Sequence, residues 1–298
     1  MVWKFNPGYT GRLYTFKYAH INRQGFLGKD LEDPKGADLI RIVALGGSVS
    51  LGYGVRGTGD CYCSLLDSLL ELEAGPWRYE VVNAASVGYS SLMGRQFVEH
   101  YLENLQPDVL VAAFGWNDSI LRHAADKDPD YWKKNRLEFT PKFGQENSIL
   151  CVMVPRIIDD ARRRLWGRGA KGVRAESANR QFVPRVSVQD FQLNLEAMHQ
   201  WCAAHGVKMV LLTEAAANDS RSSAGAIQNL QPYHTAVRQM AFSQGVPLAD
   251  VDSCLEGEGT APYYDNAEVD CVHLNRSGQL RMAQIVKQTL QSSGYLSR

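Results

Sequence analysis

The sequence predicts a doubly wound α/β fold, in which helices cover both faces of a parallel β-sheet. Short apolar segments rich in Val and Leu alternate along the chain with longer segments of helical periodicity. The apolar segments lack the polar–apolar alternation of a half-exposed strand, which is typical of parallel strands buried on both faces. This alternation favours one sheet with right-handed crossovers and with ligands bound beyond the carboxyl ends of its strands.

Five segments are expected to form the sheet. These strands are Arg41–Leu45, Tyr79–Asn83, Asp108–Phe114, Val207–Thr213 and Val246–Val251. Helical spacing of apolar residues predicts helices over residues 61–73, 91–105 and 277–291. Another helix is expected to begin after Ser187, which forms a capping box with Asp190, and to end at Gly206.

Composition excludes several classes of protein. The chain has 298 residues and 45% hydrophobic residues, so it can bury a large core and is not a disordered chain. Lys and Arg together number 32, as do Asp and Glu, and this neutrality disfavours nucleic-acid binding through bulk positive charge. No apolar run is long enough to predict a membrane span.

Neither a cofactor nor a metal is predicted. The six cysteines are sparse, and Cys61 and Cys63 lack the two-residue spacer of a zinc or redox pair. Residues 1–16 lack an apolar segment followed by a small-residue cleavage site, so no signal peptide is expected. On this basis the sequence as written is expected to be cytoplasmic, or exported or anchored if an N-terminal segment was trimmed from it. Oligomeric state stays open.

Two parts of the chain fall outside the strand–helix alternation. Residues 1–38 are polar, aromatic and rich in glycine, and we expect them to form a lead-in that packs on the core domain of residues 39–298. Residues 119–186 are too long for an ordinary connection and are interpreted as a lid-like insertion with a helix near residues 148–166. A basic run that includes Arg162, Arg163 and Arg164 is either a solvated helix face or a surface that attracts an anionic substrate.

Polar residues follow the expected strands where an α/β protein binds its ligand. Ser48 comes after Gly46 and Gly47 at the end of the first strand, and the two glycines allow a sharp turn that exposes the hydroxyl. Near the other end of the chain, Asp270 and His273 are three residues apart. Asp270 is therefore expected to hold one ring nitrogen of His273 and to leave the other free as a base.

Two further candidates follow the second and third strands. Gly88 is placed to direct a backbone N–H into a site, and Asn117, which follows Trp116, is placed to offer a side-chain amide donor. Taken singly, each of these residues is also typical of an ordinary turn. Their order along the chain makes the pattern more specific.

In that order, the chain resembles the SGNH (GDSL-type) hydrolases, a family with several bacterial members. The matching blocks are Gly46-Gly47-Ser48, Gly88, Gly115-Trp116-Asn117-Asp118 and Asp270-Cys271-Val272-His273, within about residues 40–291. The resemblance implies a three-layer flavodoxin-like fold and a serine esterase that works through an acyl-enzyme. One departure is Gly47, where the family often carries aspartate.

The same resemblance implies a role for each residue. Ser48 would be the nucleophile, His273 the general base and acid, and Asp270 the residue that orients His273. The N–H groups of Ser48 and Gly88 and the Asn117 amide would form the oxyanion hole. Trp116 and Arg162–Arg164 are candidate substrate or lid contacts. The expected substrate is a small-molecule or glycan ester, first an O-acetyl or other short acyl ester.

Alternative functions remain at this point. Acyl transfer and thioester hydrolysis use the same residues, and a catalytically silent binding module would share the fold. Residues 52–57 match the dinucleotide pattern G-x-G-x-x-G, but they begin too late after the first strand. The G-x-S-x-G elbow of another hydrolase fold is incomplete around Ser48, because residue 50 is a serine.

Overall fold

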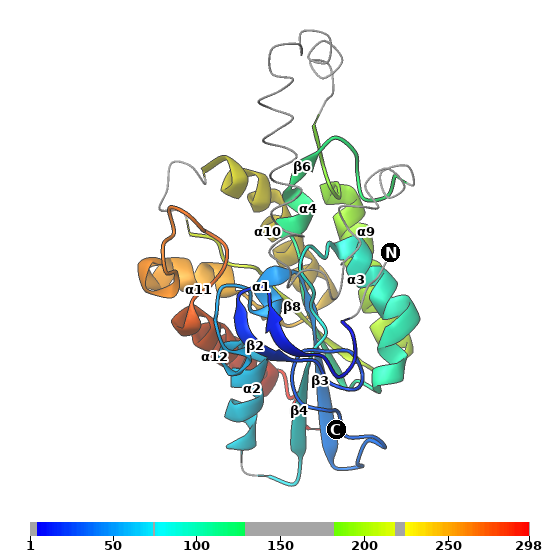
Figure 1. Cartoon of the computed structure of the whole chain (residues 1–298). Helices are drawn as coiled ribbons and strands as arrows, with labels where there is room; N and C mark the ends of the chain where they lie inside the picture. The colour runs from blue at the N-terminus through cyan, green and yellow to red at the C-terminus, as the bar shows by residue number, and fades with distance from the viewer. Residues whose placement is uncertain (1–4, 74, 129–181, 218–223, 298) are drawn as a thin grey trace. The chain divides into compact units, whose positions relative to one another are not determined.

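A computed structural model describes residues 5–73, 75–128, 182–217 and 224–297 (Figure 1). The chain divides into two compact units, the first comprising residues 1–120 and 185–298 and the second Leu121–Pro184. Each unit is described by itself below. The first unit contains every residue of the candidate active site that the structure describes.

The first unit is built on a five-stranded parallel sheet of order β4-β3-β5-β8-β9. The strands are β3 (Leu39–Gly46), β4 (Arg78–Asn83), β5 (Val109–Ala113), β8 (Lys208–Leu212) and β9 (Leu248–Ala249). In chain order this is 2-1-3-4-5, the flavodoxin-like arrangement that the family resemblance implies. The strand order reverses between β3 and β5, so a ligand crevice is expected beyond the carboxyl ends of these two strands.

Helices cover both faces of this sheet (Figure 1). One face packs on α2 (Tyr62–Glu71), α11 (Val251–Glu258) and α12 (Arg276–Ser292). The other face carries α3 (Ser91–Phe97), α9 (Val188–Ala204) and α10 (Ala224–Gln244). Every residue of β3 and β5 is buried, which explains the continuous apolar character of these strands. Two single-turn helices, α1 (Ser48–Leu51) and α4 (Trp116–Ser119), follow β3 and β5 directly.

Helix boundaries mostly follow the predicted signals. The Ser187 hydroxyl accepts a hydrogen bond from the Asp190 N–H at 3.1 Å, as the capping box predicts, and Gly206 has a positive φ just after the end of α9. The helix expected over residues 91–105 instead changes from α3 into a π-helical turn at Val98–Leu102 and a 3₁₀ turn at Glu103–Leu105.

Two elements differ from the prediction. The strand expected over Val246–Val251 is reduced to Leu248–Ala249, because the Asp250 side chain accepts a hydrogen bond from the Ser253 N–H and caps α11. The long helix α10 has no counterpart in the predicted elements. Its interior Pro232 lacks a backbone donor and is a helix-breaking signal, yet apolar residues such as Leu230 and Val237 bury that helix on the core.

The amino-terminal residues form a small hairpin of their own. Strands β1 (Thr10–Leu13) and β2 (Phe16–His20) pair antiparallel. Isolated bridges join Tyr18 to Gly57 and Leu27 to Asn83, so this segment contacts both the loop before α2 and the end of β4.

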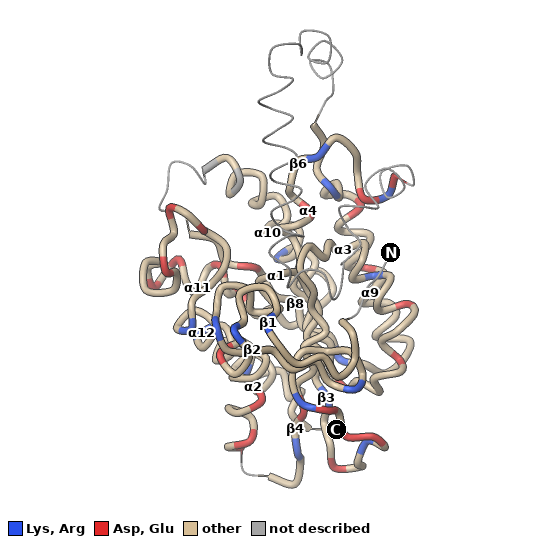
Figure 2. Tube along the Cα trace, in the orientation of Figure 1, with Lys and Arg blue, Asp and Glu red and all other residues tan. Residues whose placement is uncertain are grey.

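Charged residues gather at the amino ends of the strands, opposite the crevice. Arg41 and Glu80 form a buried ion pair at 2.5 Å, and the Arg41 guanidinium also donates to the carbonyl oxygens of Glu32 and Leu105. Figure 2 shows Lys, Arg, Asp and Glu intermixed around the starts of β3 and β4. These contacts satisfy buried charges and leave the carboxyl ends of the strands to the candidate site.

The second unit is described at its two ends. Strands β6 (Leu121–Arg122) and β7 (Val183–Pro184) pair antiparallel, and the His123 and Phe182 rings lie 4.4 Å apart. The helix expected near residues 148–166 and the basic run at Arg162–Arg164 lie outside the described residues. A lid role for the insertion therefore stays a prediction. Among the described helices, none is both long and apolar enough to cross a bilayer.

Candidate active site

Three side chains form a continuous hydrogen-bonded chain beyond the sheet. The Ser48 Oγ lies 2.9 Å from His273 Nε2, although the two residues are 225 positions apart in sequence. The other ring nitrogen of His273, Nδ1, lies 2.7 Å from Asp270 Oδ2. A serine, a histidine and a carboxylate joined in this order can abstract the serine proton as the hydroxyl attacks an electrophile.

The nucleophile candidate is held by the turn from β3 into α1. Gly46 pairs with Ala113 across the sheet, so the residues that follow β3 and β5 lie beside each other. Ser48 is the first residue of α1 and is only 7% exposed. An added Cβ at Gly46 would lie 2.5 Å from the Ala113 carbonyl oxygen, which makes glycine necessary at this position.

The second glycine of the turn makes room for Asn117. A Cβ added at Gly47 would lie 2.4 Å from Asn117 Nδ2, so the amide rests against the backbone just before Ser48. Asn117 Nδ2 donates one hydrogen bond to the Tyr89 carbonyl oxygen at 3.0 Å. A side-chain amide has two N–H groups, and among the described residues the second has no partner, so it can donate to a ligand. Glycine in place of the family's usual aspartate therefore fits the close approach of Asn117.

Gly88 lies in the loop that follows β4, beside the same turn. This loop is tied to β3 by a hydrogen bond from the Ser86 N–H to the Gly46 carbonyl at 3.1 Å, and it turns at Ser86–Tyr89. Gly88 has φ of +79° within that turn, a value that favours glycine. No atom lies within 4 Å of a Cβ added there, so the residue faces open space.

The histidine loop is fixed by its own backbone and by residues 52–57. The Asp270 carboxylate accepts hydrogen bonds from the N–H groups of Val272 and His273. The Tyr53 ring packs on the His273 ring with centroids 4.5 Å apart, and a Cβ added at Gly54 would approach His273 Cβ to 3.1 Å. The glycine-rich segment that matched a dinucleotide pattern thus supports the histidine.

Asp270 is stabilised as an anion by its partners. Partial burial opposes its ionisation, but the hydrogen bonds from the His273 ring and backbone hold the pKa of the Asp270 carboxyl below its usual range. A carboxylate in contact with Nδ1 favours the tautomer whose Nε2 accepts a proton.

Two buried carboxyl groups hold the turn that carries Asn117. Asp118 is fully buried and accepts hydrogen bonds from the N–H and the hydroxyl of Ser91 and from the Gly115 N–H. Glu214, just after β8, accepts a hydrogen bond from the Trp116 N–H at 2.9 Å. The turn is therefore anchored both to the start of α3 and to the neighbouring strand.

The structure brings together the predicted residues on one edge of the sheet. Ser48, His273 and Asp270 are in direct contact, and Asn117 approaches the Ser48 turn through Gly47. Gly88 belongs to the adjacent loop, and Trp116 is half-buried beside Asn117. Arg162–Arg164 lie outside the described residues. Within the described part of the chain, no cluster of three His, Cys, Asp or Glu side chains could hold a metal ion.

Sequence reasoning missed three supporting residues. Tyr53 carried no sequence signal, since contact with an imidazole through a distant loop has no local pattern. Asp118 was recognised only as a member of the matching block Gly115-Trp116-Asn117-Asp118, with no role of its own. Glu214 had a readable signal, because an acidic residue directly after an apolar strand lies at the edge of the sheet where ligands bind.

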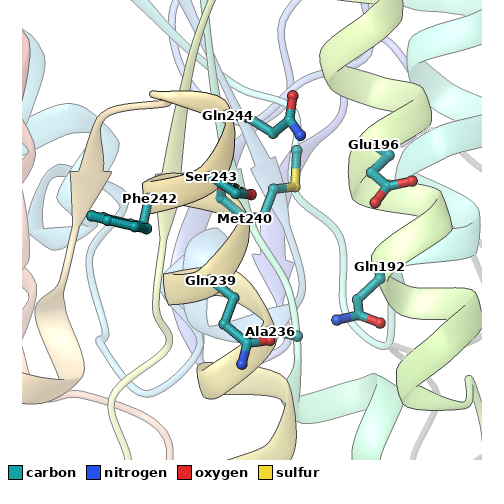
Figure 3. Close-up of a pocket in the computed structure, with 8 residues that line it drawn as sticks. All are labelled: Gln192, Glu196, Ala236, Gln239, Met240, Phe242, Ser243 and Gln244. Carbon is teal, nitrogen blue, oxygen red and sulfur yellow. Dashed lines mark hydrogen bonds between the residues drawn. The ribbon is translucent and has the colours of Figure 1, made fainter.

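A separate hollow lies between α9 and α10 (Figure 3). Its volume is about 340 Å³, and its lining includes Gln192, Glu196, Met240 and the 93% exposed Phe242. Its described lining contains Ser243 and Glu196 but no histidine, so it shows no Ser–His pair like that of Ser48 and His273.

Comparison with known proteins identifies the family. A family model described as the GDSL-like lipase/acylhydrolase family matches residues 44–281, a range that contains Ser48, Gly88, Asn117, Asp270 and His273. The chain belongs to this family, and it is a hydrolase that acts on ester bonds. No curated protein matches the chain in sequence.

Solved structures share the fold at low sequence identity. The structure of TesA is 19% identical with a TM-score of 0.53, and the match covers 85% of this chain and 98% of that one. Axe2, an acetylxylan esterase from Geobacillus stearothermophilus, is 13% identical with a TM-score of 0.54, covering 84% and 94%. A GDSL-like lipase from Parabacteroides merdae is 17% identical with a TM-score of 0.53, covering 87% and 96%. These likenesses confirm the predicted three-layer fold.

Proposed function

We propose that the chain hydrolyses a carboxylic ester through an acyl-enzyme formed on Ser48. The observation that carries this proposal is the unbroken chain of contacts from Ser48 Oγ to His273 Nε2 and from His273 Nδ1 to Asp270. A serine hydroxyl is a weak nucleophile alone, and a histidine in hydrogen-bond contact with it removes the proton as attack begins.

The reaction follows in two halves. The Ser48 Oγ attacks the ester carbonyl carbon while His273 Nε2 takes the hydroxyl proton, and a tetrahedral oxyanion forms. His273 then gives that proton to the departing alcohol, and the acyl group stays on Ser48. In the second half His273 takes a proton from water, the resulting hydroxide attacks the acyl carbon, and Ser48 recovers its proton from His273 as the carboxylic acid leaves.

We assign the oxyanion to three donors. They are the N–H of Ser48, the N–H of Gly88 and the second N–H of the Asn117 amide. The first two belong to glycine-containing turns beyond β3 and β4, and the third lies against Gly47. Donors that are already oriented before reaction stabilise developing negative charge without reorganisation.

The substrate proposed first is a short acyl ester, such as an O-acetyl group on a carbohydrate. The fold likeness to an acetylxylan esterase supports testing this class first. Trp116, half-buried beside Asn117, is proposed as a contact for the substrate. Acyl transfer to an acceptor other than water, and thioester hydrolysis, would use the same residues.

A fluorophosphonate probe tests the nucleophile in the folded protein. We expect one covalent adduct, located on Ser48 by peptide mass spectrometry, and turnover of p-nitrophenyl acetate that stops in proportion to labelling. A panel of acetyl, butyryl and octanoyl esters with acetylated sugars then ranks the substrates. Folded protein that neither labels nor turns over any of these esters would instead indicate a silent binding module.

Asn117→Ala is expected to lower kcat by about 10²- to 10³-fold, the usual cost of removing one oxyanion donor. KM should change little, because the donor acts most strongly on the tetrahedral intermediate. Steady-state kinetics with p-nitrophenyl acetate measures both constants. Asn229→Ala, which truncates an exposed asparagine on α10, is the matched control and should leave kcat unchanged. Equal kcat in Asn117→Ala and wild type would remove Asn117 from the oxyanion hole.

A further inference from the structure

Glu214 is a buried carboxyl group close to the proposed oxyanion hole. It follows β8, is 2% exposed, and accepts the Trp116 N–H at 2.9 Å through Oε2. Its other oxygen, Oε1, is buried and has no hydrogen-bond partner among the described residues. Burying a carboxyl group with only one described partner costs free energy, which indicates a role for Glu214 other than stabilising the fold.

The hydrogen bond of Glu214 holds the peptide that precedes Asn117. Gly115 has φ of +138°, a conformation in which glycine constrains the chain little. The peptide before Gly115 is held by Asp118, which accepts the Gly115 N–H at 3.2 Å. The next peptide, between Gly115 and Trp116, is held at both ends: its carbonyl oxygen accepts the Ser119 N–H at 2.9 Å within the same turn, and its N–H donates to Glu214, which ties it to the end of β8.

We propose that Glu214 is a positioning residue for the oxyanion hole, because it fixes the Trp116 peptide and thereby the Asn117 amide that follows it. The proposal rests on the proposed function, since it assumes that Asn117 stabilises an oxyanion formed at Ser48. Glu214 is a positioning residue rather than a catalytic one: it acts through this turn and, once ionised, through its charge.

The carboxyl group performs this role in its neutral form. Burial raises the pKa of the Glu214 carboxyl to about 8; the Trp116 N–H acts in the opposite direction and the negative charge of Asp118 in the same direction. The Tyr62 hydroxyl, on α2, interacts electrostatically with Glu214, and burial raises the pKa of that phenol as well. Glu214 therefore stays uncharged at neutral pH and becomes an anion as the pH rises past about 8.

The raised pKa of Glu214 has two consequences, one for kcat and one for stability. Ionised Glu214 places a negative charge against Trp116, the residue before Asn117, and this charge opposes the developing oxyanion. The value of kcat should therefore fall as the pH rises through the pKa of Glu214. The free energy of unfolding should fall at a lower pH than kcat does. Between the ordinary pKa of a glutamate and about 8, the unfolded chain has lost the proton that the folded chain still holds, so rising pH favours unfolding.

Glu214→Gln and Glu214→Ala test this inference. Glutamine keeps an oxygen acceptor for the Trp116 N–H but cannot ionise, whereas alanine removes the acceptor. We expect Glu214→Gln to keep the wild-type kcat at pH 7 and to abolish a fall of about tenfold above pH 8. Glu214→Ala should lower kcat by about tenfold or more at every pH, because a buried N–H loses its partner.

Two measurements decide the outcome. The first is kcat with p-nitrophenyl acetate from pH 6 to 9.5, with Glu256→Gln, an exposed carboxylate on α11, as the matched control. The second is thermal unfolding from pH 5 to 9, which is independent of activity. The melting temperature of Glu214→Gln should rise relative to wild type as the pH increases. If Glu214→Ala does not fold, the Glu214→Gln profiles still give the answer.

The possible failures are distinguishable. If wild type and Glu214→Gln have superimposable pH profiles of kcat and of melting temperature while Ser48-dependent turnover is intact, the role of Glu214 is wrong and the proposed function stands. If the wild-type chain shows neither labelling nor turnover at Ser48, the proposed function fails first and the positioning role fails with it.

Discussion

Ser48→Ala is expected to lower kcat for ester hydrolysis by on the order of 10⁶-fold, the size found when the serine of such a triad is removed. Alanine cannot form the acyl-enzyme, so the reaction loses the path in which His273 Nε2, at 2.9 Å from the hydroxyl, activates the nucleophile. KM should stay near its wild-type value, since alanine is smaller than serine and adds no steric obstacle to substrate binding. Steady-state kinetics on a short acyl ester measures the loss, and fluorophosphonate labelling should disappear with it.

Ser50→Ala is the matched control for this variant. Ser50 belongs to the same turn and is fully buried, but the histidine pairs with the Ser48 hydroxyl and not with that of Ser50. Circular dichroism of both variants should match wild type. Residual activity of Ser48→Ala within tenfold of wild type would contradict the assignment of the nucleophile and point to a different serine.

Asp270→Asn is expected to lower kcat by about 10⁴-fold while leaving the site almost unchanged in shape. The Asp270 carboxylate accepts from His273 Nδ1 at 2.7 Å, and it loses this role when an amide nitrogen can occupy the same position. An amide in place of the anion no longer favours the tautomer with a free Nε2, and it no longer stabilises the imidazolium formed during reaction. Pre-steady-state kinetics should show both acylation and deacylation slowed, because His273 transfers a proton in each half of the reaction.

Asp265→Asn provides the control for Asp270→Asn. Asp265 is exposed in the same loop, so its change tests whether any charge loss nearby lowers activity. We expect wild-type kcat for Asp265→Asn. A loss of less than tenfold in Asp270→Asn would mean that His273 does not depend on Asp270 for its orientation.

Much of the fold was predictable because its strands are simple in sequence. Buried parallel strands such as β3 and β5 contain few polar residues, so their position and direction follow from apolar runs bounded by turns. The turn that carries Ser48, the proposed nucleophile, was predictable because two glycines directly after a strand indicate a sharp turn. In the structure these two residues, Gly46 and Gly47, leave no room for side chains beside Ala113 and Asn117. Local patterns therefore placed Ser48, Asn117 and the pair Asp270 and His273.

The remaining features depend on contacts between distant segments. The helix α10 includes Pro232, and its burial comes from tertiary packing that no local pattern contains. The role of Glu214 depends on a hydrogen bond to Trp116, 98 residues earlier in the chain. The packing of Tyr53 on His273 likewise joins residues that have no relation in sequence.

The separation of Ser48 and His273 by 225 positions has a consequence for folding. His273, the proposed base, is brought to Ser48, the proposed nucleophile, by the packing of α12 on α2, a contact in which the Gln279 side chain accepts the Tyr62 N–H at 2.8 Å. Contacts between segments so far apart in sequence form late, because the long loop between them must close first. During refolding, enzyme activity should therefore return only when the last helix packs on the domain. A partly synthesised chain that ends before His273 would contain the proposed nucleophile but not the proposed base.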